Sequence, residues 1–178
     1  MSNELTLEQQ RMVEIWGKHT MCEFESKDTD ETMRTMTGDP HVNHVPVMTG
    51  GTGRENVRDF YSKHFIPHQP DDVELVLVSR TVGSDTIVDE LIFKFTHKID
   101  MPWMLPGISP TGKKVELPLV VIVGFVDGKI ASEHIYWDQA TVLVQIGVLS
   151  PDNLPVAGVE TARKVLDPGL PSNRLMSR

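Results

Sequence analysis

The hydrophobic period of the chain changes once, between residues 66 and 73, and this change constrains the fold more than any other feature. Before it, apolar residues such as Met12 and Trp16 recur at helical spacing behind a capping box formed by Thr6 and Gln9. After it, apolar and polar residues alternate with a period of two, as they do in half-buried strands. Helices followed by antiparallel strands predict an α+β fold.

The pattern predicts three N-terminal helices and then a four-stranded antiparallel meander. The helices are expected at 6–24, 28–36 and 52–66, a short extended segment at 41–48, and the strands at 73–82, 86–97, 114–126 and 129–137. A last helix is expected between Asp138 and Gly147, followed by an amphipathic piece near 159–166. Gly50-Gly51 is expected to be a turn before the third helix.

The strand expected at 114–126 is apolar on both faces, with Val120 and Ile122 on the face opposite its other apolar residues. Both faces must therefore be covered. Helices can cover one face, and a second copy of the chain is the economical cover for the other, which predicts a homodimer through the sheet. Pro118 has no N–H to donate and predicts a bulge or bend.

Charge and cysteine content exclude several classes of protein. Seventeen basic and twenty-five acidic residues give a net charge of −8, so neither a nucleic acid nor an anionic membrane is an expected partner. The single cysteine, Cys22, excludes an intramolecular disulfide and a cysteine-rich zinc site. The polar, acidic first residues are unlike a signal peptide, and no stretch approaches about 18 uninterrupted apolar residues, so a cytoplasmic protein is expected.

Five short motifs carry a family resemblance: LPG at 105–107, PTG at 110–112, DGKI at 127–130, YWDQ at 136–139 and QIG at 145–147. With the order of elements, they make roughly residues 5–150 resemble the SnoaL-like polyketide cyclase group of the nuclear transport factor 2-like superfamily. The resemblance implies a cone in which N-terminal helices pack on a strongly curved antiparallel or mixed sheet and enclose a pocket. It implies one domain at 1–150 and a C-terminal tail at 151–178 that packs on the domain or on a dimer partner.

The resemblance also implies a catalytic group. In similar cyclases the aspartate of the WD motif, here Asp138, is implicated as the acid/base that moves a proton next to a carbonyl. His134 and Tyr136 share a strand face with Asp138 and are candidates for holding a substrate oxygen or relaying a proton. The alternatives are that Asp138 only caps a helix and that the polar row is a solvated outer face.

Five more residues are candidates for substrate binding. Trp103, in an apolar proline-rich loop that could be a lid, and Trp137 would shape the pocket, and His44 would face its mouth. Glu90 and His97 have opposite parity on one strand, so a regular strand points one of them into the cone. No metal is expected, because neither the His41/His44 nor the His64/His68 pair comes with a matching carboxylate or thiolate motif.

These observations predict a cofactor-independent acid/base enzyme that acts on a small to medium apolar carbonyl compound by proton abstraction, leading to cyclisation or isomerisation. Two alternatives stay open: hydrolysis of an ester, lactone or epoxide by carboxylate-activated water, and ligand binding without catalysis. The superfamily contains all of these activities, so the fold does not choose among them.

Overall fold

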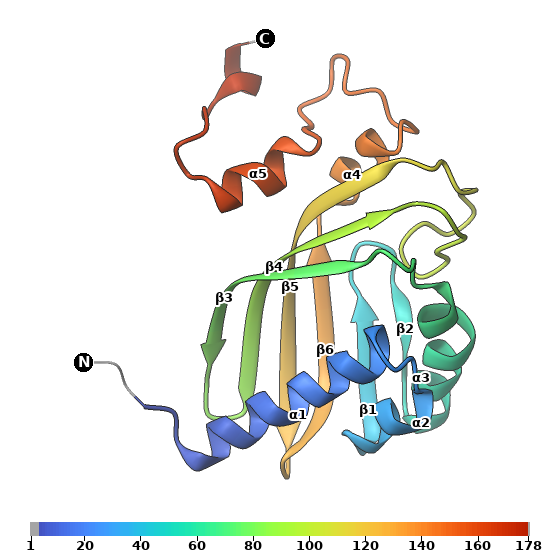
Figure 1. Ribbon diagram of the computed structural model, residues 1–178, viewed down its shortest axis with the longest axis vertical. Coiled ribbons are helices and arrows are strands. Elements are labelled where there is room, and N and C mark those ends of the chain that lie inside the picture. The colour runs from blue at the N-terminus through green and yellow to red at the C-terminus, as the bar shows by residue number, and fades with distance from the viewer. Residues whose placement is uncertain (1–3, 178) are drawn as a thin grey trace.

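The structure is a computed structural model that describes residues 4–177, and in it helices cover one side of a curved six-stranded sheet (Figure 1). The helices are α1 (Leu7–Phe24), α2 (Thr29–Arg34), α3 (Arg54–Phe60), α4 (Gln139–Gln145) and α5 (Glu160–Leu166). The strands are β1 (Met36–His44), β2 (Thr49–Thr52), β3 (Glu74–Val82), β4 (Thr86–Thr96), β5 (Lys114–Val126) and β6 (Lys129–Trp137). A π-helical turn (Tyr61–Phe65) and 3-10 turns (Ile66–His68, Arg174–Ser177) complete the described elements.

The strands lie in the order β2-β1-β6-β5-β4-β3. β3 to β6 form the predicted antiparallel meander, and β1 adds to β6 in parallel, so the sheet is mixed. The long strands bend along their length and curve around α1 (Figure 1). The α+β cone predicted from the sequence is therefore confirmed, with a sheet that is curved but not closed.

The N-terminal part of the sheet differs from the prediction. The second helix ends at Arg34 rather than near residue 36, and Met36 already begins β1. Gly38 and Pro40, read as helix stops, lie inside this strand, where the pairing with β6 shifts register. An edge segment with a bulge tolerates both residues, so their presence did not exclude a strand.

Gly50 and Gly51 belong to β2 rather than to a turn. β2 pairs antiparallel with β1, and Gly50 opposes Asn43. Gly50 has a φ of +137°, and a Cβ at this position would collide with the carbonyl oxygen of Val42. The glycine is needed because the two backbones of this hairpin approach too closely for a side chain.

Of the bulge or bend predicted at Pro118, the bulge is not observed. The pairing of β5 with β4 runs through Pro118 without a shift, and Pro118 opposes Ile92. The pairing of β5 with β6 begins one residue later, at Leu119, and its irregularity lies between Gly124 and Phe125. β6 does not pair with Pro118, so no carbonyl oxygen of β6 is left without a donor by its missing N–H.

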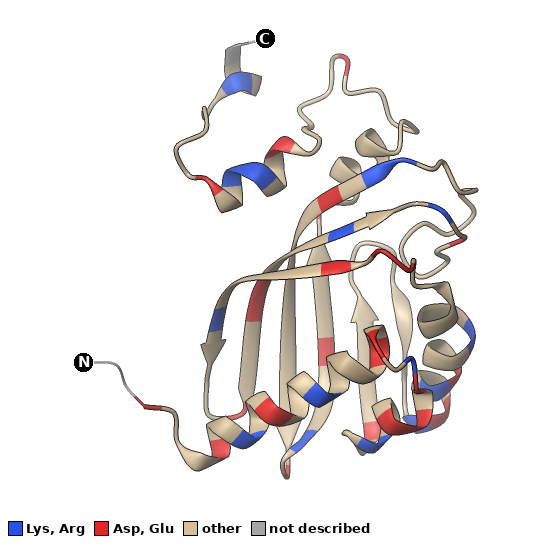
Figure 2. Cartoon of the chain, viewed as in Figure 1, with Lys and Arg blue, Asp and Glu red and all other residues tan. Residues whose placement is uncertain are grey.

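The inner face of the sheet, defined as the face toward α1 and α3, carries the hydrophobic core. Alternate residues of β5, from Val115 to Phe125, are buried on it, and Met12 and Trp16 of α1 pack against them. β5 and β6 are free of charge over most of their length (Figure 2). This core also forms the walls of the cavity described below.

The segment after α4 lies at the end of the sheet that is next to α4 (Figure 1). Within it, α5 contacts β5 and buries Ala162 completely. No helix within residues 4–177 is both long enough and apolar enough to cross a membrane.

Candidate active site

A small cavity of about 60 Å³ lies between α1, the π-helical turn and the inner face of the sheet. Aromatic side chains form much of its wall, chiefly Trp16, Phe24, Phe65, Phe93 and Trp103. Its polar lining residues are Thr20, Glu23, His44, Tyr61 and Glu133. Leu75 of β3 is 38% exposed while Phe24 of α1 is half-buried, so the mouth opens between β3 and α1. An apolar site with a few convergent polar groups is the usual form of a small-molecule pocket.

Three elements bring four polar side chains together at one side of this cavity. His19 and Glu23 are four residues apart on α1 and therefore share one helix face. Glu133 points inward from β6, with the same parity as the buried Ile135 and Trp137. Tyr61 begins the π-helical turn after α3. We call His19, Glu23, Tyr61 and Glu133 the buried cluster, because each is at least 95% buried.

Short contacts connect all four members of the buried cluster. Nε2 of His19 lies 3.1 Å from Oε1 of Glu23 and 3.1 Å from Oε1 of Glu133. The hydroxyl of Tyr61 donates to Oε1 of Glu133 at 3.0 Å and lies 3.2 Å from Nε2 of His19. These contacts fix the Glu133 carboxylate from two sides.

Thr35 is the hydrogen-bond partner of Nδ1 of His19. Its hydroxyl donates to the carbonyl oxygen of Thr32 at 2.6 Å, so its oxygen accepts the proton on Nδ1 of His19, also at 2.6 Å. Nε2 faces two carboxylates and is best satisfied as a second donor. Burial alone would lower the pKa of His19, but the charges and hydrogen bonds of Glu133 and Glu23 outweigh it and raise the pKa to about 10. His19 is therefore a buried cation at neutral pH.

The two carboxyl groups differ in their affinity for a proton. Burial raises the pKa of Glu23, and the neighbouring His19 only partly opposes this effect. Burial also acts on Glu133, but the charge of His19 and the hydrogen bonds from His19 and Tyr61 exceed it and lower the pKa of Glu133. Burial and the adjacent carboxylates raise the pKa of Tyr61 well above its ordinary value. The preferred state is an ionised Glu133 beside a Glu23 that holds a proton more readily.

His44 occupies another part of the cavity wall, at the end of β1. Its ring centre lies 5.2–5.9 Å from those of Phe60, Phe65, Trp103 and Trp137. Burial in this aromatic setting lowers the pKa of His44 to about 4, so the imidazole is neutral at neutral pH. Nδ1 of His44 is buried and has no hydrogen-bond partner.

A hydrogen-bonded ion pair holds the wall beside His19. Arg80 of β3 donates from Nε and Nη2 to the two oxygens of Asp89 on β4, both at 2.7 Å. Asp89 also accepts the indole N–H of Trp16 at 2.8 Å, and the Trp16 ring stacks on the ring of His19 with centres 5.5 Å apart. This network fixes the position of Trp16 against the imidazolium.

The buried cluster also offers three atoms that could hold a metal ion. One ligand atom each from His19, Glu23 and Glu133 lies within 4.8 Å of the other two. Binding would require Nε2 of His19 and the carboxyl group of Glu23 to give up their protons.

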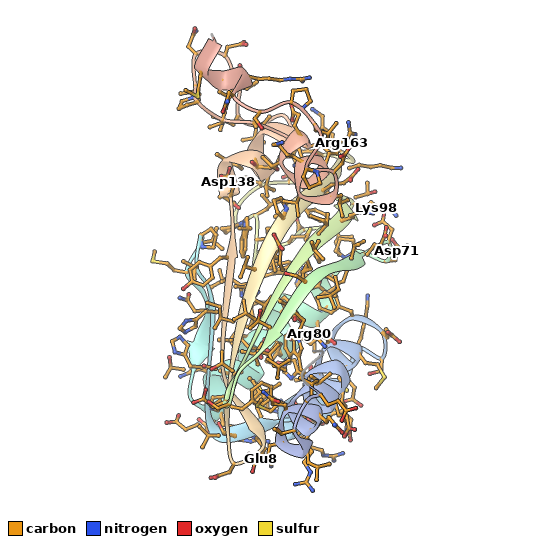
Figure 3. All side chains as sticks on the ribbon, turned by 90° about the vertical axis from the view of Figure 1, so that its left-hand side faces the viewer. Glu8, Asp71, Arg80, Lys98, Asp138 and Arg163 are labelled. Atoms are coloured by element: carbon orange, nitrogen blue, oxygen red, sulfur yellow. The ribbon has the colours of Figure 1, made fainter. Side chains whose placement is uncertain are left out.

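The structure places Asp138 outside the cavity. Asp138 is the exposed N-cap of α4, where its carboxylate accepts from the backbone N–H of Ala140 at 2.9 Å and from the hydroxyl of Thr141 at 2.8 Å. Figure 3 shows Asp138 at the end of β6 next to the C-terminal segment, whereas Arg80 lies close to α1. This geometry agrees with the alternative in which Asp138 only caps the helix.

The other members of the predicted polar row also point away from the cavity. Tyr136 is 41% exposed, and His134 is half-buried against the ring of His41, with centres 5.2 Å apart. Both lie on the outer face of β6, as the solvated-face alternative describes.

The aromatic candidates contribute to the cavity. Trp103 is buried in its wall, and the loop that carries it packs into the core through Met101, Met104 and Leu105. Trp137 lies on the inner face of β6 behind this wall, with its ring centre 6.4 Å from that of Trp103.

Glu90 and His97 have opposite parity, as expected, but neither lines the described cavity. Glu90 lies on the outer face of β4 and accepts from the hydroxyl of Ser79 at 3.0 Å. His97 follows β4 and is buried, with Nδ1 3.3 Å from the hydroxyl of Thr111. Burial lowers the pKa of His97.

The sequence analysis missed the buried cluster, although two signals point to it. His19 and Glu23 interrupt the apolar stripe of the first helix at i, i+4 spacing, and Trp16 lies three residues before His19 on the same face. Glu133 has the parity of Ile135 and Trp137, so the apolar side of that strand already carried an acidic residue. The polar side of this strand, with His134 and Tyr136, faces out instead.

The curved mixed sheet, the covering helices and the polar groups in an apolar cavity define the nuclear transport factor 2-like, or ketosteroid isomerase-like, class of folds. A model of the SnoaL-like polyketide cyclase family matches residues 7–146, and the chain belongs to this family. No match to the chain is found among curated proteins.

Solved structures agree on the fold at low sequence identity. A putative SnoaL-like polyketide cyclase from Jannaschia sp. CCS1 is 18% identical, with a TM-score of 0.64 over 84% of this chain and 100% of that one. AclR, a putative hydroxylase from Streptomyces galilaeus, is also 18% identical, with a TM-score of 0.61 over 80% of this chain and 88% of that one. SalBIII, an epoxide hydrolase/cyclase-like enzyme with a role in forming the pyran ring of the polyether salinomycin, is 16% identical. Its TM-score is 0.53 over 73% of this chain and 92% of that one.

Proposed function

We propose that the protein is an acid/base enzyme that abstracts a proton from the carbon next to a carbonyl group of a small to medium apolar compound, with Glu133 as the base. One observation carries the proposal: Glu133 is a buried carboxylate that lines an apolar cavity and is kept ionised by His19. A carboxylate in such a site is not hydrated, so it can accept a proton without first losing a shell of water molecules.

In the proposed step, a C–H bond breaks, its proton passes to Glu133, and its electron pair forms an enolate on the substrate. In a β,γ-unsaturated ketone the enolate extends to the γ-carbon and is protonated there, which completes an isomerisation. In a dicarbonyl compound the enolate attacks the second carbonyl carbon, and the alkoxide that forms takes up a proton as the ring closes. Glu23 faces the same cavity and, because it holds a proton more readily, is the group that returns one. His19 does not line the cavity, so it is a positioning residue that acts through Glu133 and Glu23.

Hydrolysis by a water molecule that Glu133 activates is the second candidate, supported by the neighbour described as epoxide hydrolase/cyclase-like. Ligand binding without turnover is the third. All three place a ligand in the same cavity, and only the first predicts exchange of a carbon-bound proton.

The test uses 2-indanone, a small apolar ketone with acidic α-protons, incubated with the protein in D₂O. Exchange of the α-protons, followed by NMR, should be faster than in buffer. Glu133→Gln should slow it on the order of 100-fold or more. Glu116→Gln, on the outer face of β5, is the matched control and should exchange normally. An equal rate in wild type and Glu133→Gln would refute the assignment of the base.

Asp138→Asn separates this assignment from the one suggested by the family motif. If Asp138 is only the cap of α4, the variant keeps its stability, because asparagine caps a helix about as well as aspartate, and it keeps its exchange rate. If Asp138→Asn abolishes exchange in a folded protein while Glu133→Gln does not, Asp138 is the base.

We also propose that two copies of the chain pair through the outer face of the sheet. Ile122 of β5 is 36% exposed there, Val120 is half-buried, and Tyr136 lies on the neighbouring strand β6. Within the described residues these side chains remain partly open to solvent, and a second sheet would bury them.

A further inference from the structure

The enclosed part of the cavity is smaller than most compounds that an enzyme of the proposed kind would act on. It measures about 60 Å³, whereas an apolar cavity that holds benzene measures about 150 Å³. A carbonyl group and the carbon atoms on either side of it fill such a space. The remainder of a larger ligand therefore extends through the mouth, and the side chains at the mouth decide which remainder is favourable.

The mouth exists because α1 and β3 are held together at one end and stand apart at the other. Nε2 of Gln9, near the start of α1, donates to the carbonyl oxygen of Val82 at 3.2 Å. Further along β3, Arg80 still lies close to α1 (Figure 3). Within residues 4–177, no hydrogen bond connects α1 with residues 74–79 of β3. The inner face of this part of β3 is therefore left uncovered by the helix.

Two leucines on the inner face of β3 are open to solvent at this place. Leu75 and Leu77 oppose Phe93 and Leu91 of β4, and both of these partners line the cavity. The partners are 2% and 8% exposed, whereas Leu75 is 38% and Leu77 is 52% exposed. Two exposed leucines that continue the wall of a cavity form an apolar patch that a ligand can cover.

The α1 side of the mouth offers a ligand no charge. The charged lining residues, Glu23 and Glu133, belong to the buried cluster, while Thr20 and Phe24 line the cavity nearer to the mouth. The hydroxyl of Thr20 donates to carbonyl oxygens of its own helix. Gly17 lies on the same stripe, three residues before Thr20, and no atom lies within 4 Å of where its Cβ would be. A glycine weakens a helix interior, and here it leaves open space beside the mouth.

We propose that the substrate is an extended carbonyl compound, whose carbonyl end occupies the enclosed cavity and whose alkyl tail lies in the mouth against Leu75 and Leu77. Two residues along a strand span about 7 Å, which matches an alkyl tail of about five carbon atoms. The inference deepens the proposed function, on which it rests for placing the carbonyl end at Glu133. It assigns Leu77, which lies beyond the enclosed cavity, a part in choosing substrates by length.

Binding measurements test the proposal without requiring turnover. Trp16 and Trp103 line the cavity, so their fluorescence reports occupancy. The ligands are 2-butanone, 2-hexanone and 2-octanone, which differ only in chain length, and pinacolone, a compact ketone with as many carbon atoms as 2-hexanone. A fully buried methylene improves affinity about fourfold, and the mouth covers one side of the tail, so each added methylene should improve it about twofold. Wild type should thus bind 2-octanone on the order of tenfold more tightly than 2-butanone, and pinacolone more weakly than 2-hexanone.

Leu77→Asp should reduce the gain from 2-butanone to 2-octanone to about threefold or less. Leu77→Thr keeps a residue that is well suited to a strand and should also lose most of the gain, which controls for misfolding of the aspartate variant. Leu77→Met is apolar and of similar size and should retain the gain. Leu166→Asp changes a leucine of similar exposure on α5, outside the cavity, and should behave as wild type.

Three results would overturn the proposal: equal affinities of wild type for 2-butanone and 2-octanone, binding of pinacolone as tight as that of 2-hexanone, or a full chain-length gain in both Leu77→Asp and Leu77→Thr. The two proposals fail separately. A chain-length gain that depends on Leu77, found in a protein that exchanges no α-proton, would refute Glu133 as a base and leave the tail site standing.

Discussion

Nε2 of His19 lies 3.1 Å from Oε1 of Glu133, and this buried pair joins α1 to β6, a central strand of the sheet. The contact favours the ionised form of Glu133, because burial by itself raises the pKa of this carboxyl group. The positive charge of His19 reverses that preference. The first prediction follows from removing this charge.

His19→Gln should raise the pKa of Glu133, since the desolvation of the carboxylate then lacks its counter-charge. The acid limb of the exchange rate against pH should therefore move to higher pH. The measurement is kcat/KM for 2-indanone exchange as a function of pH. A variant that is slower at every pH, with an unmoved acid limb, would show that His19 supports the fold and not the ionisation of Glu133.

The same histidine should make stability fall as the pH rises. The pKa of His19 is about 10 in the folded protein against an ordinary value of 6.5, so the folded state binds more protons between these values. Its contribution is fully present below pH 6.5 and is lost as the pH approaches 10, with a slope of up to about 1.4 kcal/mol per pH unit. Urea unfolding from pH 6.5 to 10 should show a smaller slope for His19→Gln than for wild type or His64→Gln.

His44 should have the opposite effect, on the acid side. Its pKa is about 4 in the folded protein, below the ordinary 6.5, so the unfolded state binds more protons between these values. The contribution of neutral His44 is complete above pH 6.5 and is lost as the pH falls to 4. The free energy of unfolding of His44→Phe, relative to wild type, should therefore improve as the pH falls through this range. A difference that stays constant with pH would contradict a buried neutral histidine.

Arg80 should be needed to hold Asp89 in the wall beside Trp16. Arg80→Met leaves a buried carboxylate with only the indole N–H as a donor, and we expect a loss of roughly 3 kcal/mol in urea unfolding. Asp89→Asn in the Arg80→Met background removes the unpaired charge and should recover part of this loss. If the double variant is no more stable than Arg80→Met, the uncompensated charge is not the cause.

The outer face of the sheet provides the test of the proposed dimer. Ile122→Lys places a charge on this face, and Val126→Lys, on the exposed end of the same strand, adds the same charge near the Asp127-Gly128 turn. Sedimentation velocity should show a dimer for wild type and Val126→Lys and a monomer for Ile122→Lys. A monomeric wild type at micromolar concentration would remove the proposal.

The local elements were predictable because their causes are local. The Thr6–Gln9 capping box starts α1 as expected, and the period-two alternation places β3 to β6 close to their observed bounds. The family motifs implied the cone. The extended segment predicted at 41–48 covers only the second half of β1. Its first half was missed because Gly38 and Pro40 read as breakers, and the pairing partner in β6 lies about 90 residues further along the chain.

The sequence by itself determined the class of fold and the parity of each strand residue, since side chains alternate along any strand whatever it packs against. It could not decide which face of β6 turns inward, and so it favoured His134, Tyr136 and Asp138 over Glu133. Only the tertiary structure decided this, because α1 covers one face and brings His19 and Glu23 to it. The ionisation of Glu133 and the neutrality of His44 depend on burial and on partners from distant segments, and neither exists before the chain folds.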